Sequence, residues 1–370
     1  MSSQSVTLRN IALCIVFILA VSVKSGAARV GSPAEDNKYQ VTFGESYSNY
    51  SPGSLIRISI VFKNNSQDNV KVSHELKVLD SAGVKVWKTI INLELLPGGD
   101  VTVPLMVPVP KFTGTFTLTA GDAAGGNSEG IPSFRFHVIR PNKSPRLAKI
   151  LVHTPDNEAL LNAFLKTWNI KAPTISWGQV LLLGKKSQTL LAAGDHGIIQ
   201  LIDRALNREM SVIFLDFGSA SDGREANTPK IQLPFDVSVS FIKASSPEQA
   251  FMLKSDYKEL TYSFSSNKVE SWNGFYGVTV PSTDLRFEGK RVKINAYATA
   301  GNNPFRFPVV ELIPLNGKGK IYLCQLLTDG RLDALSKTPR NKPGLPAYDP
   351  MAVQFLLNLI SASVGDNLLK

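Results

Sequence analysis

Cysteine and histidine are both scarce in this sequence. Its 370 residues include 2 cysteines, Cys14 and Cys324, and 4 histidines. Cys14 lies in an apolar N-terminal segment that we expect to be removed, which leaves Cys324 without a disulfide partner. None of the histidines pairs with another at the spacing that zinc sites use. We therefore predict no disulfide, no metal centre and no cofactor, and a weak calcium site on loop carboxylates stays open as an alternative.

Nucleotide-binding signatures are missing as well. Neither Gly-x-Gly-x-x-Gly nor Gly-x-x-x-x-Gly-Lys-Ser/Thr occurs, although Gly184-Lys185-Lys186-Ser187 follows a predicted strand. The formal net charge is +10, but the positive residues are scattered. This distribution gives little support to nucleic-acid binding. We predict no nucleic-acid partner, and a basic surface that meets polyanionic glycans or an anionic envelope is the milder interpretation.

The N-terminus has the three parts of a secretory signal peptide. Arg9 supplies positive charge, Ile11–Val23 is uncharged and apolar, and Ser25–Ala28 offers small residues for cleavage. The apolar run is shorter than the roughly 20 residues of a membrane span. We predict that residues 1–28 are a signal peptide, with an uncleaved anchor as the alternative. The mature chain is then exported to the periplasm, cell surface or extracellular space, with no membrane span.

Residues 39–140 have the pattern of an all-β domain. Leu55–Phe62 alternates apolar and polar residues, and turn clusters such as Asp80–Gly83 and Leu96–Asp100 separate the runs. Strands at this spacing are typical of an immunoglobulin-like sandwich. We predict seven of them, at Gln40–Phe43, Leu55–Asn64, His74–Leu79, Val84–Leu95, Val101–Val107, Thr113–Ala120 and Ser133–Ile139.

The pattern changes after the stiff linker 141–145, where we place a domain boundary. Apolar runs at 147–153, 179–183 and 210–217 predict buried strands, and helical spacing predicts helices at 157–168 and 194–208. Strands that alternate with helices indicate an open, mostly parallel α/β sheet. The predicted fold class is thus two-domain, a β-sandwich at 39–140 and an α/β domain at 147–365. Residues 218–306 are assigned to an insertion, with a short helix at 246–253.

The end of the chain predicts the last parts of the α/β domain. Strands are expected at 308–314 and 320–327, and a helix at 350–360 begins with Asp349 as N-cap and Pro350 in the first turn. We expect Glu311, Gly317, Gly319, Asp349 and Asn358 to close this domain rather than to act on a substrate.

Two stretches carry a resemblance to a known family. Val180–Gly184 (Val-Leu-Leu-Leu-Gly) precedes the run from Ile198 to Leu215, and Glu311–Ile360 ends the chain in a similar form. Together they resemble the class I glutamine-amidotransferase-like (flavodoxin-like) domain appended to bacterial glycoside hydrolase family 2, or β-galactosidase-type, proteins. The resemblance covers about 147–217 and 307–361. It implies an accessory part, because a catalytic barrel of about 250 residues has no room in this chain.

The resemblance also indicates the position that a catalytic nucleophile would occupy. Amidotransferases place a cysteine on the turn after a strand, here the turn after Val212–Leu215, and this chain has Asp216–Ser219 there. We therefore expect no amidotransferase activity. A serine hydrolase with His153 or His196 is the alternative, although Gly-x-Ser-x-Gly is absent. Its catalytic candidates are Asp216, Ser219, Ser221 and Asp222.

Ligand-binding candidates come from two patterns. His153 and Lys185 follow predicted strands, at the edge where open α/β sheets bind ligands. Trp272 and Tyr276 offer aromatic faces for stacking on a sugar, although a packed insertion accounts for them as well. We predict an exported, non-catalytic accessory or binding protein in carbohydrate processing or envelope assembly, with a glycan or envelope protein partner. The alternatives are a secreted hydrolase of glycans or esters, and a piece that works beside a separate glycosidase.

Overall fold

The computed structural model describes residues 39–364, apart from positions 45, 123–131, 174–177, 219–229, 235, 244–245, 255, 265, 267, 270–271, 275–276, 290–291, 302, 304, 316–318 and 334–346. The predicted signal peptide and the candidates Ser219, Ser221, Asp222 and Tyr276 lie outside the described residues.

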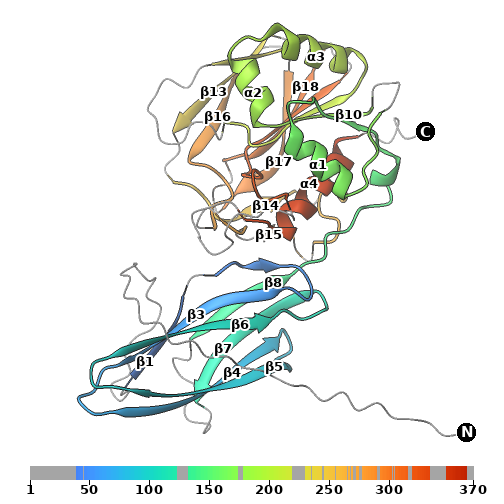
Figure 1. Cartoon of the computed structure of the whole chain (residues 1–370). Coiled ribbons are helices and arrows are strands. Elements are labelled where there is room, and N and C mark those ends of the chain that lie inside the picture. Colours follow the sequence, from blue (N-terminus) through green and yellow to red (C-terminus); the bar gives the residue numbers. More distant parts are fainter. Residues whose placement is uncertain are drawn as a thin grey trace, which may run out of the picture.

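Strands of the first hundred described residues form two sheets, shown in blue to green in Figure 1. One has the order β1-β3-β6, and the other β2-β8-β7-β4-β5. All seven predicted strands are present, and the two-residue β2, which pairs parallel to β8, was missed. The strands are β1 (Tyr39–Phe43), β2 (Asn49–Tyr50), β3 (Leu55–Asn64), β4 (Val70–Asp80), β5 (Lys85–Leu95), β6 (Asp100–Pro108), β7 (Gly114–Asp122) and β8 (Ser133–Val138).

Alternation along these strands produces the core between the two sheets. Ile56, Ile58, Ile60 and Phe62 of β3 are all buried, whereas Arg57 between them is exposed. Successive side chains of a strand point to opposite faces, so every second residue reaches the core. A one-residue slip in register would expose this apolar row, which fixes the pairing of β3.

Residues 152–324 build an eight-stranded sheet with the order β15-β14-β17-β18-β19-β11-β10-β9. The pairs from β9 to β19 are parallel, and the pairs from β19 to β15 are antiparallel. Its strands are β9 (Val152–His153), β10 (Val180–Leu183), β11 (Ser211–Phe214), β14 (Phe251–Leu253), β15 (Lys268–Val269), β17 (Val292–Ala300), β18 (Val309–Pro314) and β19 (Lys320–Cys324). A separate antiparallel sheet contains β12 (Ile231–Leu233), β13 (Val237–Lys243) and β16 (Thr283–Glu288).

The predicted fold class, a sandwich beside a mostly parallel α/β domain, is wrong. The described chain is mostly β, with 44% strand and 17% helix, and its largest sheet is mixed. The error lies in residues 218–306, predicted as an insertion, which supply β14, β15 and β17 to the sheet itself. Phe251–Leu253 is a strand rather than part of a helix. The loop from β17 to β18 is too short for a parallel crossover, so these strands pair antiparallel.

Helices cover both faces of the large sheet. α1 (Ala159–Thr167) and α4 (Pro350–Ser363) pack on one face, and α2 (Lys185–Ala192) and α3 (His196–Asn207) pack on the other (Figure 1). A single 3-10 turn, η1 (Leu147–Lys149), leads into β9. The predicted helices correspond to α1, α3 and α4. Asp349 caps α4, because its Oδ1 accepts hydrogen bonds from Met351 N at 2.6 Å and Ala352 N at 3.0 Å.

A buried polar cluster ties the sandwich to the large sheet, so the two parts are not laid out as separate units. Asn49 of β2 donates from Nδ2 to Asp349 Oδ2 at 2.9 Å. Asn273 donates from Nδ2 to the Asn49 carbonyl at 2.6 Å, and its Oδ1 accepts from Asn49 N at 3.0 Å. Arg331, fully buried, donates to the carbonyls of Asn273 and Gly274 at 2.6 and 2.9 Å. The Asp349 carboxylate therefore has two roles: it caps α4, and it accepts the hydrogen bond that joins β2 of the sandwich to this helix.

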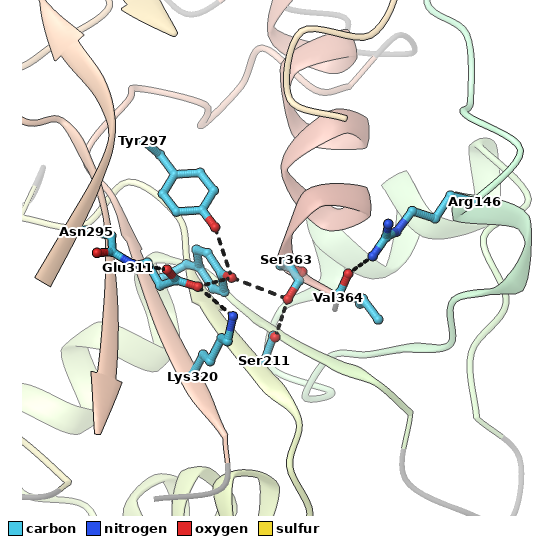
Figure 2. Close-up of polar contacts among 9 residues, drawn as sticks. Arg146, Ser211, Asn295, Tyr297, Glu311, Lys320, Ser363 and Val364 are labelled. Carbon is cyan, nitrogen blue, oxygen red and sulfur yellow. Dashed lines mark hydrogen bonds and ion pairs between the residues drawn. The ribbon is translucent and has the colours of Figure 1, made fainter. Parts of the chain in front are cut away.

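Glu311 lies at the opposite end of the sheet and is 2% exposed. Figure 2 shows its carboxylate between the side chains of Asn295 and Lys320. It accepts hydrogen bonds from Tyr322 Oη at 2.7 Å, Asn295 Nδ2 at 2.8 Å and Lys320 Nζ at 3.0 Å. Ser211 Oγ donates to the Ser363 carbonyl at 2.7 Å, which fastens the end of α4 to the start of β11 (Figure 2). The expected role of Glu311 in closing this part of the fold fits these contacts.

Replacing Glu311 by glutamine is expected to lower the free energy of unfolding by about 1–3 kcal/mol at pH 7, because charge-assisted hydrogen bonds become neutral ones. Burial opposes the charge, but the hydrogen bonds from Tyr322, Asn295 and Lys320 outweigh it and hold the pKa of Glu311 below its usual value. The charged form thus stabilises the fold above the unfolded-state pKa and loses this effect as pH falls.

Urea denaturation at several pH values checks this prediction, and the difference between the two proteins should shrink as the solution becomes acidic. The matched control is Glu288→Gln, because Glu288 pairs with Lys230 at 2.5 Å on an exposed surface. Exposed pairs contribute little, so the control should differ much less from the wild type. A pH-independent loss for Glu311→Gln would contradict the assigned role of its charge.

Among the residues that the structure describes, no helix is both long enough and apolar enough to cross a membrane.

Candidate functional site

The carboxyl ends of the four parallel strands meet at one edge of the large sheet. His153 ends β9, Gly184 follows β10, Asp216 follows β11 and Gln325 follows β19. Open sheets with parallel strands bind ligands at this edge. Leu151, the residue before β9, also forms an isolated parallel bridge with Lys171. The predicted residues His153, Lys185 and Asp216 are thus brought to the same edge.

Asp216 occupies the turn where a nucleophile was considered. Its φ is +54°, a left-handed conformation uncommon outside glycine and asparagine-like residues. The carboxylate is 5% exposed and turns toward the loop after β19. It accepts hydrogen bonds from Thr328 N at 2.5 Å, Thr328 Oγ1 at 2.6 Å and Asp329 N at 3.0 Å. Asp216 therefore fastens the ends of two neighbouring strands to each other.

Burial sets the protonation of this carboxyl group. It raises the pKa of Asp216 to about 6, although the hydrogen bonds from Thr328 and Asp329 act in the opposite direction. Because the folded pKa is above the unfolded one, the protonated form favours folding. The stabilisation is complete below the unfolded pKa near 3.8 and is lost as pH rises through about 6.

Asp216→Asn is expected to remove this pH dependence. The asparagine Oδ1 can accept from both backbone N–H groups and its Nδ2 can donate to Thr328 Oγ1, so the local contacts survive. Relative to wild type, the variant should gain up to roughly 3 kcal/mol of stability between pH 4 and pH 7. Chemical denaturation across this range measures the difference, with the exposed Asp203→Asn of α3 as control. A difference that stays flat with pH would contradict the raised pKa.

The second buried carboxylate of the edge belongs to Glu158, at the start of α1. Its Oε1 accepts from Gly184 N at 3.1 Å and from Ser187 N at 2.7 Å. These amides form the first turn of α2, where a helix attracts negative charge. A Cβ on residue 184 would lie 2.6 Å from Glu158 Oε2, so any larger residue there would displace this carboxylate. No helix was predicted here, whereas Lys185 is the first residue of α2.

Gln188, on the next turn of α2, connects this helix to the turn that follows β11. Its Nε2 donates to the Leu215 carbonyl at 2.6 Å, and its Oε1 accepts from Gly218 N at 3.1 Å. The backbone on both sides of Asp216 is thus held by α2. Neither Glu158 nor Gln188 was predicted as a site residue, and the polar positions facing the sheet from short helices would have been the signal.

Hydroxyl oxygens at this edge are buried without a hydrogen-bond partner among the described residues. They are Thr154 Oγ1, beside His153, and Ser187 Oγ, beside the Glu158 carboxylate. Burial lowers the pKa of His153, and the charge of Asp156 acts against this shift. A neutral imidazole, two hydroxyls and an engaged carboxylate can hold a small polar molecule by hydrogen bonding. They form no nucleophile–base pair in the part of the chain that the structure describes.

Trp272, the aromatic candidate, is 1% exposed. Its ring packs edge-on against Phe251 at 5.5 Å and tilts against Phe355 at 5.7 Å between ring centroids. The Arg331 guanidinium lies 5.5 Å from the Trp272 ring centroid. In this position the indole contributes to the core and presents no face to solvent.

The described residues include neither an exposed thiol nor a group of metal ligands. Cys324 is fully buried in β19, and burial raises the pKa of its thiol. Within the described ranges, no three side chains of histidine, cysteine, aspartate or glutamate are grouped as metal ligands would be.

No family model and no curated protein matches this chain. A solved β-glucosidase from Listeria innocua, in complex with gluconolactone, is 14% identical over 27% of this chain, with a TM-score of 0.23. This chain spans 16% of that protein's length. The CARDB domain of a Pyrococcus furiosus protein is 14% identical over 28% of this chain and 94% of its own, with a TM-score of 0.23. Overlaps of this extent establish neither the fold of the whole chain nor a function.

Proposed function

We propose that the chain is an exported, non-catalytic accessory or binding protein that acts in carbohydrate processing or envelope assembly by binding a glycan or a protein partner. The observation that carries the proposal is the burial and hydrogen bonding of the Asp216 side chain. Its two carboxylate oxygens accept three hydrogen bonds from residues 328 and 329, and the side chain is buried. A carboxylate held in this way serves the fold and is not presented to a substrate.

The resemblance to amidotransferase-like domains of β-galactosidase-type proteins remains part of this proposal. It agrees with an accessory role, because the turn after β11 carries Asp216 in place of a cysteine. The proposed partner in that case is a separate glycosidase. A neighbouring reading frame that encodes a catalytic barrel would support this arrangement.

A secreted hydrolase of glycans or esters is the competing function, with Asp216, Ser219, Ser221 and Asp222 as its residues. Turnover of chromogenic glycosides and esters by wild type and by Asp216→Asn separates the two. The proposal predicts rates equal to the buffer for both proteins. Turnover by the wild type that the substitution abolishes, while the variant remains folded, would overturn it. Asp216→Asn suits this test because its expected effect on stability is favourable at neutral pH.

A further inference from the structure

A pocket of about 500 Å³ opens at the far edge of the large sheet, where β14 pairs with β15. The segment 247–252 forms one wall, and Lys268, Val278 and Gly301 complete the lining. Its volume lies within the roughly 300–1,000 Å³ typical of small-molecule sites. The lining includes neither His153 nor Asp216, so the strand-end site does not account for this pocket.

The chemistry of the lining favours a neutral, hydroxyl-rich ligand. Glu248 and Lys268 bring one charge of each sign, and Gln249 adds an amide. Opposite charges on the same pocket offset each other, which disfavours a strongly ionic ligand, while all three groups can hydrogen-bond hydroxyls. Met252 and Val278 add apolar surface beside them. A pyranose ring has this combination, with hydroxyls around its rim and an apolar C–H face.

One buried arginine holds the surroundings of the pocket in place. Arg306 is 4% exposed, and its Nη1 donates to the Ser246 carbonyl at 2.7 Å. Its Nη2 donates to the carbonyl of Pro281, and its Nε lies 2.7 Å from an Asp284 carboxylate oxygen. Residues 246 and 281 flank the wall segments, so a single side chain fastens the pieces that line the pocket. Such fixed walls reduce the entropy lost when a ligand binds.

The loop that begins at the pocket also displays an aromatic ring. Phe305 is 85% exposed, and the loop is shaped by a hydrogen bond from Phe305 N to Asn303 Oδ1 at 3.0 Å. Ala300 N donates to the Arg306 carbonyl at 2.9 Å and closes the base of this loop. A phenyl ring kept in water on a fixed loop suits stacking on an apolar face of a ligand.

We propose that this pocket is the binding site for a neutral saccharide. The inference rests on the proposed binding function and specifies where the glycan binds and of which class it is. Glu248 and Gln249 hydrogen-bond its hydroxyls, and Met252 packs on the ring. Phe305 then extends the surface for a longer oligosaccharide.

Gly301 provides a variant that narrows the pocket. Its φ is +49°, and an added Cβ would lie 2.5 Å from Glu248 Oε2, so Gly301→Ala must displace that carboxylate. Gly53→Ala is the matched control, because Gly53 has φ +73° and an added Cβ there meets nothing within 4 Å. Both variants have comparable backbone strain, and only Gly301→Ala alters the pocket. Glu248→Gln, which keeps the size of the side chain, is the second pocket variant.

Methyl NMR with ¹³C-methyl methionine locates the binding. Met252 lines the pocket, and Met106, 66% exposed on β6 of the sandwich, reports non-specific contact. The probes are cellotriose, maltotriose, xylotriose and triacetylchitotriose, each titrated into the purified full chain. We expect one of them to shift the Met252 methyl signal and leave Met106 unchanged. Gly301→Ala and Glu248→Gln should weaken this binding at least about tenfold, and Gly53→Ala should not.

Two results would overturn the inference, and they differ in what they say of the proposed function. Binding that leaves Met252 unchanged and persists in Gly301→Ala and Glu248→Gln rejects this pocket but keeps a glycan-binding protein. Absence of binding by all four probes, while a protein partner co-purifies, rejects the pocket and the glycan part of the proposed function together.

Discussion

Asp349→Ala is expected to lower the free energy of unfolding by about 3–5 kcal/mol, since it removes the acceptor of a fully buried cluster. The carboxylate caps α4 through Met351 N and Ala352 N, and it accepts from the side chain of Asn49 and the backbone of Asn273. Burial raises its pKa, and these hydrogen bonds act against that rise. Without the carboxylate, the Asn49 side chain, the Asn273 N–H and two N–H groups of α4 lose this acceptor.

The control is Asp195→Ala. Asp195 caps α3 with one hydrogen bond, to Ile198 N at 3.0 Å, and is exposed. Loss of such a cap costs about 1 kcal/mol. Urea denaturation of both variants measures the contrast. Equal losses would mean that Asp349 acts only as a helix cap and that the joint with the sandwich contributes nothing.

Arg331→Met should destabilise the protein by a similar amount, about 3–5 kcal/mol, because buried carbonyls lose their donor. The guanidinium donates to the carbonyls of Asn273, Gly274, Val278 and Leu327 at 2.6–2.9 Å. Burial lowers the pKa of Arg331 to about 10, and the charges of Asp349 and Asp216 favour its charged form. The side chain thus holds together the backbone at residues 273, 274 and 278.

Arg331→Lys distinguishes donor geometry from charge, because an ammonium cannot match a planar fork of five N–H groups. It should recover only part of the lost stability. Arg57→Met, at an exposed position on β3, is the control and should stay close to wild type. Full recovery by lysine, measured by thermal unfolding, would show that charge alone matters at this position.

Local elements of this fold were largely predictable. Leu55–Asn64 was predicted as a strand with the bounds that β3 has, because its alternation is regular. The cap at Asp349 and the start of α4 at Pro350 also agree with the structure, because capping chemistry is local. Helix α2 was missed because Lys185-Lys186-Ser187-Gln188 has little apolar periodicity, and contacts with β10 and α3 decide its conformation.

The direction of the strands was harder to predict than their existence. A short apolar run such as Val309–Pro314 or Val292–Ala300 has the same composition in a parallel and in an antiparallel pair. The fold class was therefore wrong even though β18 and β19 were expected as the closing strand pair. Connection length was the available signal, because the short loop between β17 and β18 permits only a hairpin.

The location of the candidate site was predictable from the sequence, but the hydrogen-bond partners of its residues were not. His153, Lys185 and Asp216 were placed at one edge because carboxyl ends of parallel strands meet there. The partners of Asp216 lie more than a hundred residues away, at Thr328 and Asp329, and no local pattern indicates them. The same holds for Asn49 and Asp349, whose hydrogen bond spans 300 positions. Long-range polar pairs of this kind appear only in the folded structure.

A glycan-array pull-down with the purified chain tests the non-catalytic binding account most directly. Wild type and Asp216→Asn are applied in parallel, and both retained protein and released sugar are measured. The account predicts that both proteins are retained on the same glycans and that neither releases sugar. Release of sugar by the wild type that Asp216→Asn abolishes would contradict it, because Asp216 would then act on a substrate.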